Sequence, residues 1–174
     1  LTHAVQAQQA CALDPGWDAD GKLVADGSRL GENIVVQPDG KVLVGCNPFG
    51  DSYAYIKRYN PDGSVDATYG TNGKFTVQVA ERRTDIDGMV LHNGTLYICG
   101  STTTDIGGTN TYVYAAAIQA NGAWDNAFGT GGVKKFNSGI TDFYTAGDIG
   151  VDANGKIYMT GLEWLDNAFV VRMN

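Results

Sequence analysis

A short motif that recurs about every 55 residues is the feature that most constrains this chain. The pattern Asp-x-x-aromatic-[Gly/Asp]-x-x-Gly occupies residues 14–21, 66–73 and 125–132 of the 174-residue sequence. Self-similarity at a regular period indicates a repeat architecture, in which each unit buries its apolar face against its neighbours. The sequence therefore predicts three units of one kind.

Two hairpins separate one motif from the next. The first turns at residues 39–40, 93–94 and 154–155, where Asp-Gly or Asn-Gly lies between runs rich in β-branched residues. This is a strong hairpin signal, because glycine adopts a positive φ without strain. The second hairpin turns at residues 61–63 and 120–122, and residues 169–174 are the equivalent strand of the third unit. Four short strands with two glycine turns per unit are typical of a propeller blade.

The predicted fold is all-β, a propeller-like repeat of about three four-stranded blade units with no significant helix. Of the 19 acidic residues 16 are Asp and three are Glu, which favours turns over helices. Strands are expected at residues 34–37, 41–45, 54–59, 74–79, 88–92, 95–100, 112–118, 133–136, 148–152, 156–161 and 168–173.

The alternation of apolar residues along these strands predicts the core. Its expected members are Ile34, Val36, Val42, Val44, Ile56, Val90, Leu96, Ile98, Ile118, Val151, Ile157, Met159 and Val170.

The segment Asn-Pro-Asp-Gly-Ser-Val-Asp-Ala-Thr-Tyr-Gly at residues 60–70 resembles the delta-60 repeat family of bacterial proteins. The hairpin at residues 37–42 also matches, and the resemblance covers residues 12–174, although residues 119–124 depart from the Pro-Asp-Gly form. The resemblance implies a β-propeller-like fold in a secreted or surface protein. Because the family is mostly uncharacterised, it implies no active site.

The domain organisation expected from these features is an N-terminal extension, residues 1–11, followed by repeats at about 12–63, 64–122 and 123–174. The small-x-small spacing of Val5-Gln6-Ala7 makes the extension either a secretory-signal remnant or an ordinary N-terminus. A third possibility is strand exchange, in which residues 1–24 complete the sheet that residues 169–174 leave unfinished. Exchange between copies predicts a homo-oligomer, either a closed ring or a filament.

The repeated aspartates Asp14, Asp66 and Asp125 are the candidate metal ligands, since oxygen-rich loops bind Ca²⁺. The alternative, which the absence of a dense acidic run favours, is an Asp turn that accepts from the backbone two residues on. No other cofactor is expected.

Two groups of aromatic residues are candidates for contact with a ligand. Trp17, Tyr69 and Phe128 recur at one motif position and are expected to pack between blades rather than to bind sugars. Phe49, Tyr112 and Trp164 lie on or beside the variable linkers and are the candidate ligand contacts.

Catalysis is not expected. The only histidines are His3 and His92, and no Ser lies in G-x-S-x-G, which disfavours a metal site or a hydrolase triad. Glu32, Glu81 and Glu163 have no identifiable acidic partner for glycoside hydrolysis.

Charge, hydropathy and cysteine content limit the classes of partner that the protein could bind and the compartment in which it could lie. A net charge of -7 disfavours nucleic acid, and no apolar run reaches the roughly 20 residues of a membrane span. The three cysteines, Cys11, Cys46 and Cys99, lack zinc spacing and allow either one disulfide or three thiols. Low charge with abundant Asn, Gly, Thr and Tyr favours an extracellular or cell-surface location, in a bacterium or phage.

The function that these observations favour is a non-catalytic surface module for self-assembly, adhesion or scaffolding. A lectin-like glycan-binding propeller and a component of a phage tail or fibre are the alternatives. A glycan or a surface protein would be the partner in the binding roles.

Overall fold

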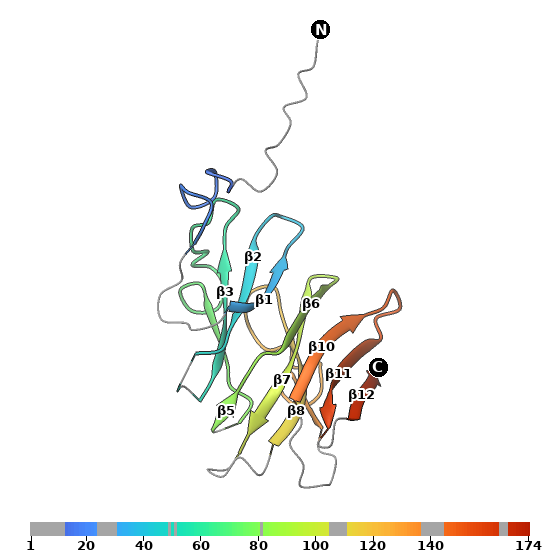
Figure 1. Ribbon diagram of the computed structural model, residues 1–174. Helices are drawn as coiled ribbons and strands as arrows, with labels where there is room; N and C mark the ends of the chain where they lie inside the picture. Colours follow the sequence, from blue (N-terminus) through green and yellow to red (C-terminus); the bar gives the residue numbers. More distant parts are fainter. Residues whose placement is uncertain are drawn as a thin grey trace.

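Three antiparallel sheets form the structure (Figure 1), and the last strands of the first two sheets, at residues 74–77 and 133–136, follow the second and third copies of the motif. The computed structural model describes residues 13–23, 31–48, 50, 52–80, 82–104, 111–136, 145–163 and 167–174. In this part of the chain all the regular structure is β-strand, which confirms the predicted fold class. None of it is a helix long and apolar enough to cross a membrane.

The first and third sheets are meanders of strands that follow one another in the chain, and the second adds a short edge strand out of that order. The first sheet has the order β1 (Gly31–Val36), β2 (Val42–Cys46), β3 (Ala54–Tyr59) and β4 (Lys74–Val77). In the second, β7 (Thr95–Thr103) pairs with β5 (Arg83–Thr84), β6 (Gly88–His92) and β8 (Thr111–Ile118), and β8 pairs with β9 (Val133–Phe136). The third contains β10 (Thr145–Val151), β11 (Ile157–Glu163) and β12 (Asn167–Met173).

All eleven predicted strands are present, and β3, β6 and β9 have the predicted bounds. The strand expected at residues 74–79 ends at Val77, and β5 was not predicted. A side chain of β7 stabilises this two-residue strand, because Thr102 Oγ1 donates to the Arg83 carbonyl at 2.7 Å.

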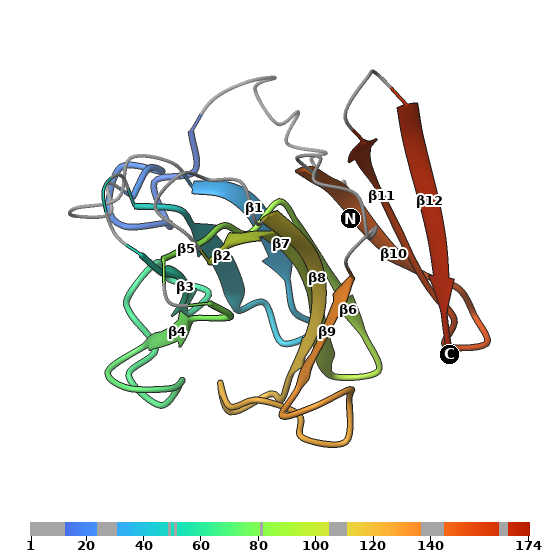
Figure 2. The same cartoon turned by 90° about the horizontal axis from the view of Figure 1, so that it is seen from below.

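The sheets stack face to face in an open fan, with the first and third sheets at its ends (Figure 2). One apolar cluster fills the space between the first and second sheets, and includes Leu43, Ile56, Ile98 and Ile118. A second cluster, with Cys99, Ala115, Ile157 and Met159, lies between the second and third sheets. The core is therefore divided into two layers, one for each contact between neighbouring repeats.

The second sheet is buried on both faces because it has a neighbour on each side. Its leading face, which carries Ile98 and Ile118, packs on the first sheet. Its trailing face, which carries Cys99 and Ala115, packs on the third. The two-residue period of a strand places adjacent residues on opposite faces, so a run such as Ile98-Cys99 contributes to both layers. We use "leading" and "trailing" in this sense for all three sheets.

Most of the predicted core is buried, but the prediction was wrong for three residues. Ile34, Val36 and Val170 are 68%, 63% and 69% exposed. Their apolar alternation is real, but Ile34 and Val36 lie on the leading face of the first sheet and Val170 on the trailing face of the third. No described sheet packs on either face. Val44, opposite Ile34 in the register, is half-buried for the same reason.

The remaining predicted core residues lie in the two layers, except Val42, which is buried on the leading face of the first sheet opposite Val36. Val42, Ile56, Leu96, Ile98, Ile118, Ile157 and Met159 are buried, and Val90 and Val151 are partly buried. The prediction omitted Leu43, which is 2% exposed and faces the second sheet.

Cys46 and Cys99 are free, buried thiols, and Cys11 lies outside the described residues. Burial, reinforced by the nearby Asp87 and Asp148 carboxylates, raises the pKa of the Cys99 thiol to about 12. A thiol in this environment remains protonated and acts as a small apolar side chain.

Ile56 and Val170 form a matched pair for testing this burial pattern, since they occupy the same position in β3 and β12. We expect Ile56→Ala to lower the free energy of unfolding by about 2–5 kcal/mol, because Ile56 is fully buried and truncation leaves a cavity. In dilute solution Val170→Ala should change it by no more than about 0.5 kcal/mol. Urea denaturation measures both, and equal losses would contradict the assigned faces.

Candidate functional site

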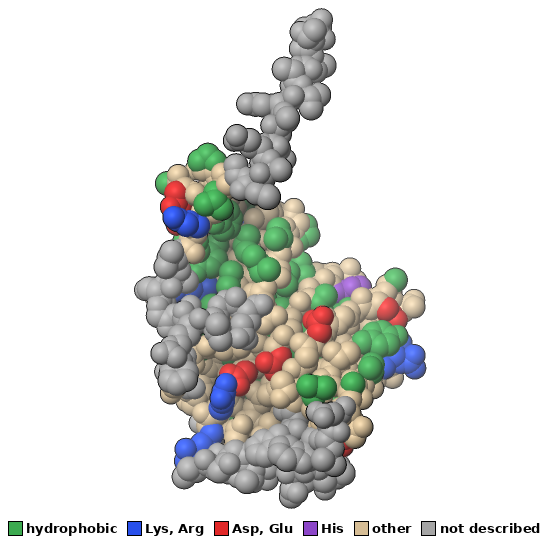
Figure 3. Space-filling model, viewed as in Figure 1, with side chains coloured by type: hydrophobic (Ala, Val, Ile, Leu, Met, Phe, Trp, Pro, Cys, Tyr) green, Lys and Arg blue, Asp and Glu red, His purple; other side chains and the backbone are tan. Residues whose placement is uncertain are grey.

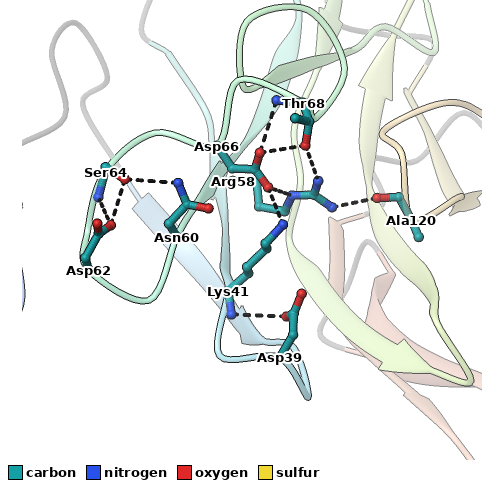
Figure 4. A network of polar contacts seen from close by, with 9 residues as sticks. All are labelled: Asp39, Lys41, Arg58, Asn60, Asp62, Ser64, Asp66, Thr68 and Ala120. Carbon is teal, nitrogen blue, oxygen red and sulfur yellow. Dashed lines mark hydrogen bonds and ion pairs between the residues drawn. The ribbon is translucent and has the colours of Figure 1, made fainter.

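An ion-pair network around Asp66 fixes the second copy of the motif to the first sheet (Figure 4). Lys41 Nζ and Arg58 Nε each donate to Asp66 Oδ2 at 2.8 Å. The other oxygen, Oδ1, accepts from the Thr68 hydroxyl at 2.6 Å. Arg58 also donates through NH1 to the Ala120 carbonyl in the second repeat, at 2.6 Å. One guanidinium thus joins the strand, the motif and the neighbouring repeat.

The network keeps Asp66 ionised although its side chain is nearly buried. The hydrogen bond from Lys41 is the main cause that lowers the pKa of the Asp66 carboxyl far below its usual range. The bonds from Thr68 and the charge of Arg58 add to it, while burial opposes it. Two cations and two further donors therefore surround one carboxylate, as a buried charge requires.

The other two motif aspartates form the same turn without these cations. The Oδ1 atoms of Asp14, Asp66 and Asp125 accept from the backbone N–H two residues on, at 2.8, 3.1 and 3.2 Å. This is the Asp turn that the sequence analysis gave as the alternative to Ca²⁺ binding. No group of three or more His, Cys, Asp or Glu in the described residues could hold a metal ion.

The motif aromatics lie between repeats, as predicted, at the two positions that an internal layer covers. Tyr69 is 1% exposed in the first layer, and Phe128 packs on the second and meets Tyr97 edge to face. Burial raises the pKa of the Tyr69 hydroxyl, which has no hydrogen-bond partner among the described residues. Trp17 belongs to the first motif and remains half-buried.

The predicted ligand contacts are not brought together by the described structure. Tyr112 is half-buried on β8, while Phe49 and Trp164 lie outside the described residues. An open cleft of about 910 Å³ lies elsewhere, between the second motif and the turn of the second repeat. Lys57, Lys74 and Asn121 contribute to its lining. It contains no pair of acids for hydrolysis and no nucleophile with a base.

A backbone contact that recurs at equivalent positions of the chain shows where the first motif lies. The Gly70 N–H of the second motif donates to the carbonyl of Asn121, in the turn that follows β8, at 2.9 Å. At the equivalent positions the Asp18 N–H donates to the Asp62 carbonyl at 3.0 Å. Asp18 even has the positive φ, 43°, that Gly70 has in the second motif, 54°. The first motif therefore lies against the first sheet as the motif of a preceding repeat would.

The exposed apolar residues of the sheets gather at the two ends of the fan. Ile34 and Val36 are on the leading face of the first sheet, around which Figure 3 shows many hydrophobic side chains. Leu162, 56% exposed, and Val170 are on the trailing face of the third. We call these two surfaces the leading end and the trailing end.

The edge of the third sheet also differs from the others. In the first sheet β3 pairs with β4, and in the second β8 pairs with β9. The equivalent strand of the third sheet is β12, and no described segment pairs with its outer edge. The trailing end thus combines an apolar face with an open strand edge.

Comparison with known proteins supports the repeat architecture. Residues 37–69 match a family model described as a domain of unknown function (DUF5122) beta-propeller. This stretch contains the turn of the first hairpin, β2, β3 and the Lys41, Arg58, Asp66 and Thr68 side chains of the network. No curated protein matches the chain. The match supports a β-propeller-like repeat, and the narrower assignment to delta-60 repeats stays a prediction.

Sequence reasoning missed Lys41 and Arg58, the two residues that give the network its charge. A signal was present, because each directly precedes an apolar residue of a predicted strand, Val42 or Tyr59, and these two residues pair across the sheet. Combining strand register with the repeat alignment would have placed both cations beside Asp66.

We expect Asp66→Asn to lower the free energy of unfolding at neutral pH by about 3 kcal/mol, because it leaves buried Arg58 without its carboxylate. The folded-state pKa lies below the ordinary 3.8, so ionised Asp66 stabilises the fold above that pH and the contribution is lost as the pH falls further. Urea titrations below pH 3.8 should therefore show a smaller acid-induced loss in the variant. Parallel pH profiles would contradict this role.

Tyr69→Phe tests the unpartnered hydroxyl. The third motif already has Phe128 at this position, and a buried hydroxyl without a partner costs about 1–3 kcal/mol. We expect the variant to be as stable as the wild type or more so in thermal denaturation. A large loss would show that the hydroxyl has a stabilising partner.

Proposed function

We propose that this protein is a non-catalytic β-repeat module that assembles with further copies of itself, the leading end of one copy on the trailing end of the next. The observation that carries the proposal is that both ends expose positions that are buried or partly buried where two repeats meet inside the chain. Large exposed apolar surfaces on soluble proteins commonly mark interaction sites.

The leading end matches a face that is already covered within the chain. Ile34 and Val36 are equivalent to Met89 and Leu91 of the second repeat, which pack on the first apolar layer. On the trailing end, Val170 is equivalent to Ile56 and to Ala115, both fully buried. A second copy would therefore cover each end with a sheet face of the kind that covers the equivalent positions inside the chain.

The open edge of β12 supports the same arrangement. In the first sheet the Arg58 N–H donates to the Gly73 carbonyl at 3.0 Å, and the Asp66 N–H donates to the Arg58 carbonyl at 2.9 Å. The second sheet repeats both bonds through Ala117, Gly132 and Asp125, at 3.0 and 2.9 Å. The equivalent groups are the N–H and the carbonyl of Arg172 in β12, the carbonyl of Gly21 and the N–H of Asp14. Addition of residues 14–23 from another copy would complete the third sheet by β-augmentation.

Two copies joined in this way would contain six blades, within the four to eight that propellers use. A rotation that does not close would extend the same contact into a filament. The low charge of the sequence remains our basis for proposing an extracellular or cell-surface location. Glycan binding and a place in a phage fibre remain predictions from sequence alone.

We expect sedimentation equilibrium of the full chain to show a species of twice its 18.5 kDa, or a larger polymer, that dissociates on dilution. Val170→Asp should shift the equilibrium to the monomer, because a carboxylate would be buried in the contact without a partner. Deletion of residues 1–24 should have the same effect.

The control is Asn93→Asp, which places the same charge on the exposed hairpin turn of the second sheet, to which neither end belongs. Circular dichroism should show that all variants keep the fold. A full chain that remains monomeric at every concentration would overturn the proposal.

A further inference from the structure

The third sheet carries a second copy of the cation pair that binds Asp66. Lys41 and Arg58 precede Val42 and Tyr59, which pair across β2 and β3. Lys156 and Arg172 precede Ile157 and Met173, which pair in the same way across β11 and β12. Register and repeat alignment therefore agree that these are equivalent positions.

This second pair binds no carboxylate within the described residues. Lys156 Nζ donates to the Asn174 side chain at 2.7 Å, and the Arg172 side chain is exposed. The acid closest to Lys156 in the chain, Asp152, is held in its own turn. Its Oδ1 accepts from the Asn154 and Lys156 N–H groups, at 2.8 and 2.9 Å.

The cation pair is not a general feature of the repeat. In the second sheet the equivalent positions are Thr95 and Ala117, and the motif acid there, Asp125, accepts only from a backbone N–H. Lysine and arginine therefore occur together at these positions in the first and third repeats, and in the first they are bound to a motif aspartate.

The acid that corresponds to this empty pair is Asp14 of the first motif. Its side chain is exposed, and among the described residues its one hydrogen-bond partner is the N–H of Gly16. The first motif already occupies the place of a preceding repeat, through the bond from Asp18 to Asp62. A repeat that precedes the first sheet there and carries the cation pair, as the third repeat does, would present both cations to Asp14.

We propose that Lys156 and Arg172 of one copy bind the Asp14 carboxylate of the next copy, and that Arg172 stacks on Trp17. The inference rests on the proposed self-assembly and identifies the ionic contact that selects its register. Arg58 supplies the template, since its Cζ lies 4.7 Å from the centre of the Tyr69 ring. The carbonyl of Pro61, equivalent to that of Ala120, would accept the remaining guanidinium donor.

The contact would give the assembly its polarity. A trailing end offers two cations, and a leading end offers one carboxylate beside an aromatic ring. Two like ends placed together would bring like charges into contact, which disfavours head-to-head pairing. Apolar burial alone lacks this discrimination because it is not directional.

Charge reversal of the full chain tests the proposal. We expect Asp14→Arg and Arg172→Asp each to raise the dissociation constant at least about tenfold, measured by sedimentation, because each places like charges at the contact. An equimolar mixture of the two variants should assemble with near wild-type affinity. Every contact between different variants restores one opposite-charge pair.

Asp125→Asn and Lys135→Met are the matched controls. The first removes the motif acid that has no cation pair, the second an exposed lysine, and both should leave the dissociation constant unchanged. If the wild type assembles while the reversed variants match these controls, the ionic contact is overturned and self-assembly stands. Failure of the mixture to recover would also overturn it. A wild type that never assembles would overturn both proposals.

Discussion

Each sheet of this protein has two apolar faces, and the need to cover both is the constraint on which the rest of the structure depends. Adjacent strand residues such as Ile98 and Cys99 place their side chains in different apolar layers. A sheet therefore needs a neighbour on each side to bury both of its faces. The second sheet meets the requirement with a neighbour on each side. The first and third meet it on one face each, which makes the two ends of the fan the chemically distinctive surfaces of the molecule.

The fold could be predicted from sequence because the same motif and the same turn signals occur in three units. Asn-Gly and Asp-Gly turns fixed the hairpins, and the spacing of the motif fixed the number of units. Burial could not be predicted in the same way. Ile34, Val170 and Ile56 have the same local pattern, and only the position of their sheet in the array decides which of them is covered.

Only part of the candidate site could be predicted from the sequence. The recurring Asp14, Asp66 and Asp125 stood out, and so did their turn geometry, because both are local along the chain. The cations that distinguish Asp66 come from two other strands, and strand register brings Lys41 and Arg58 to it. The three aspartates are therefore alike in sequence and unlike in charge environment, a difference that emerges only when repeats and sheets are aligned together.

The central claim is that a further copy covers the trailing end and pairs with β12. Hydrogen–deuterium exchange of the full chain at low and high protein concentration tests it most directly. The amide of Arg172, equivalent to the Arg58 amide that donates to Gly73, should exchange quickly in dilute solution and become protected as concentration rises. The Arg58 amide should be protected throughout. Exchange of Arg172 that stays fast at every concentration would contradict the account.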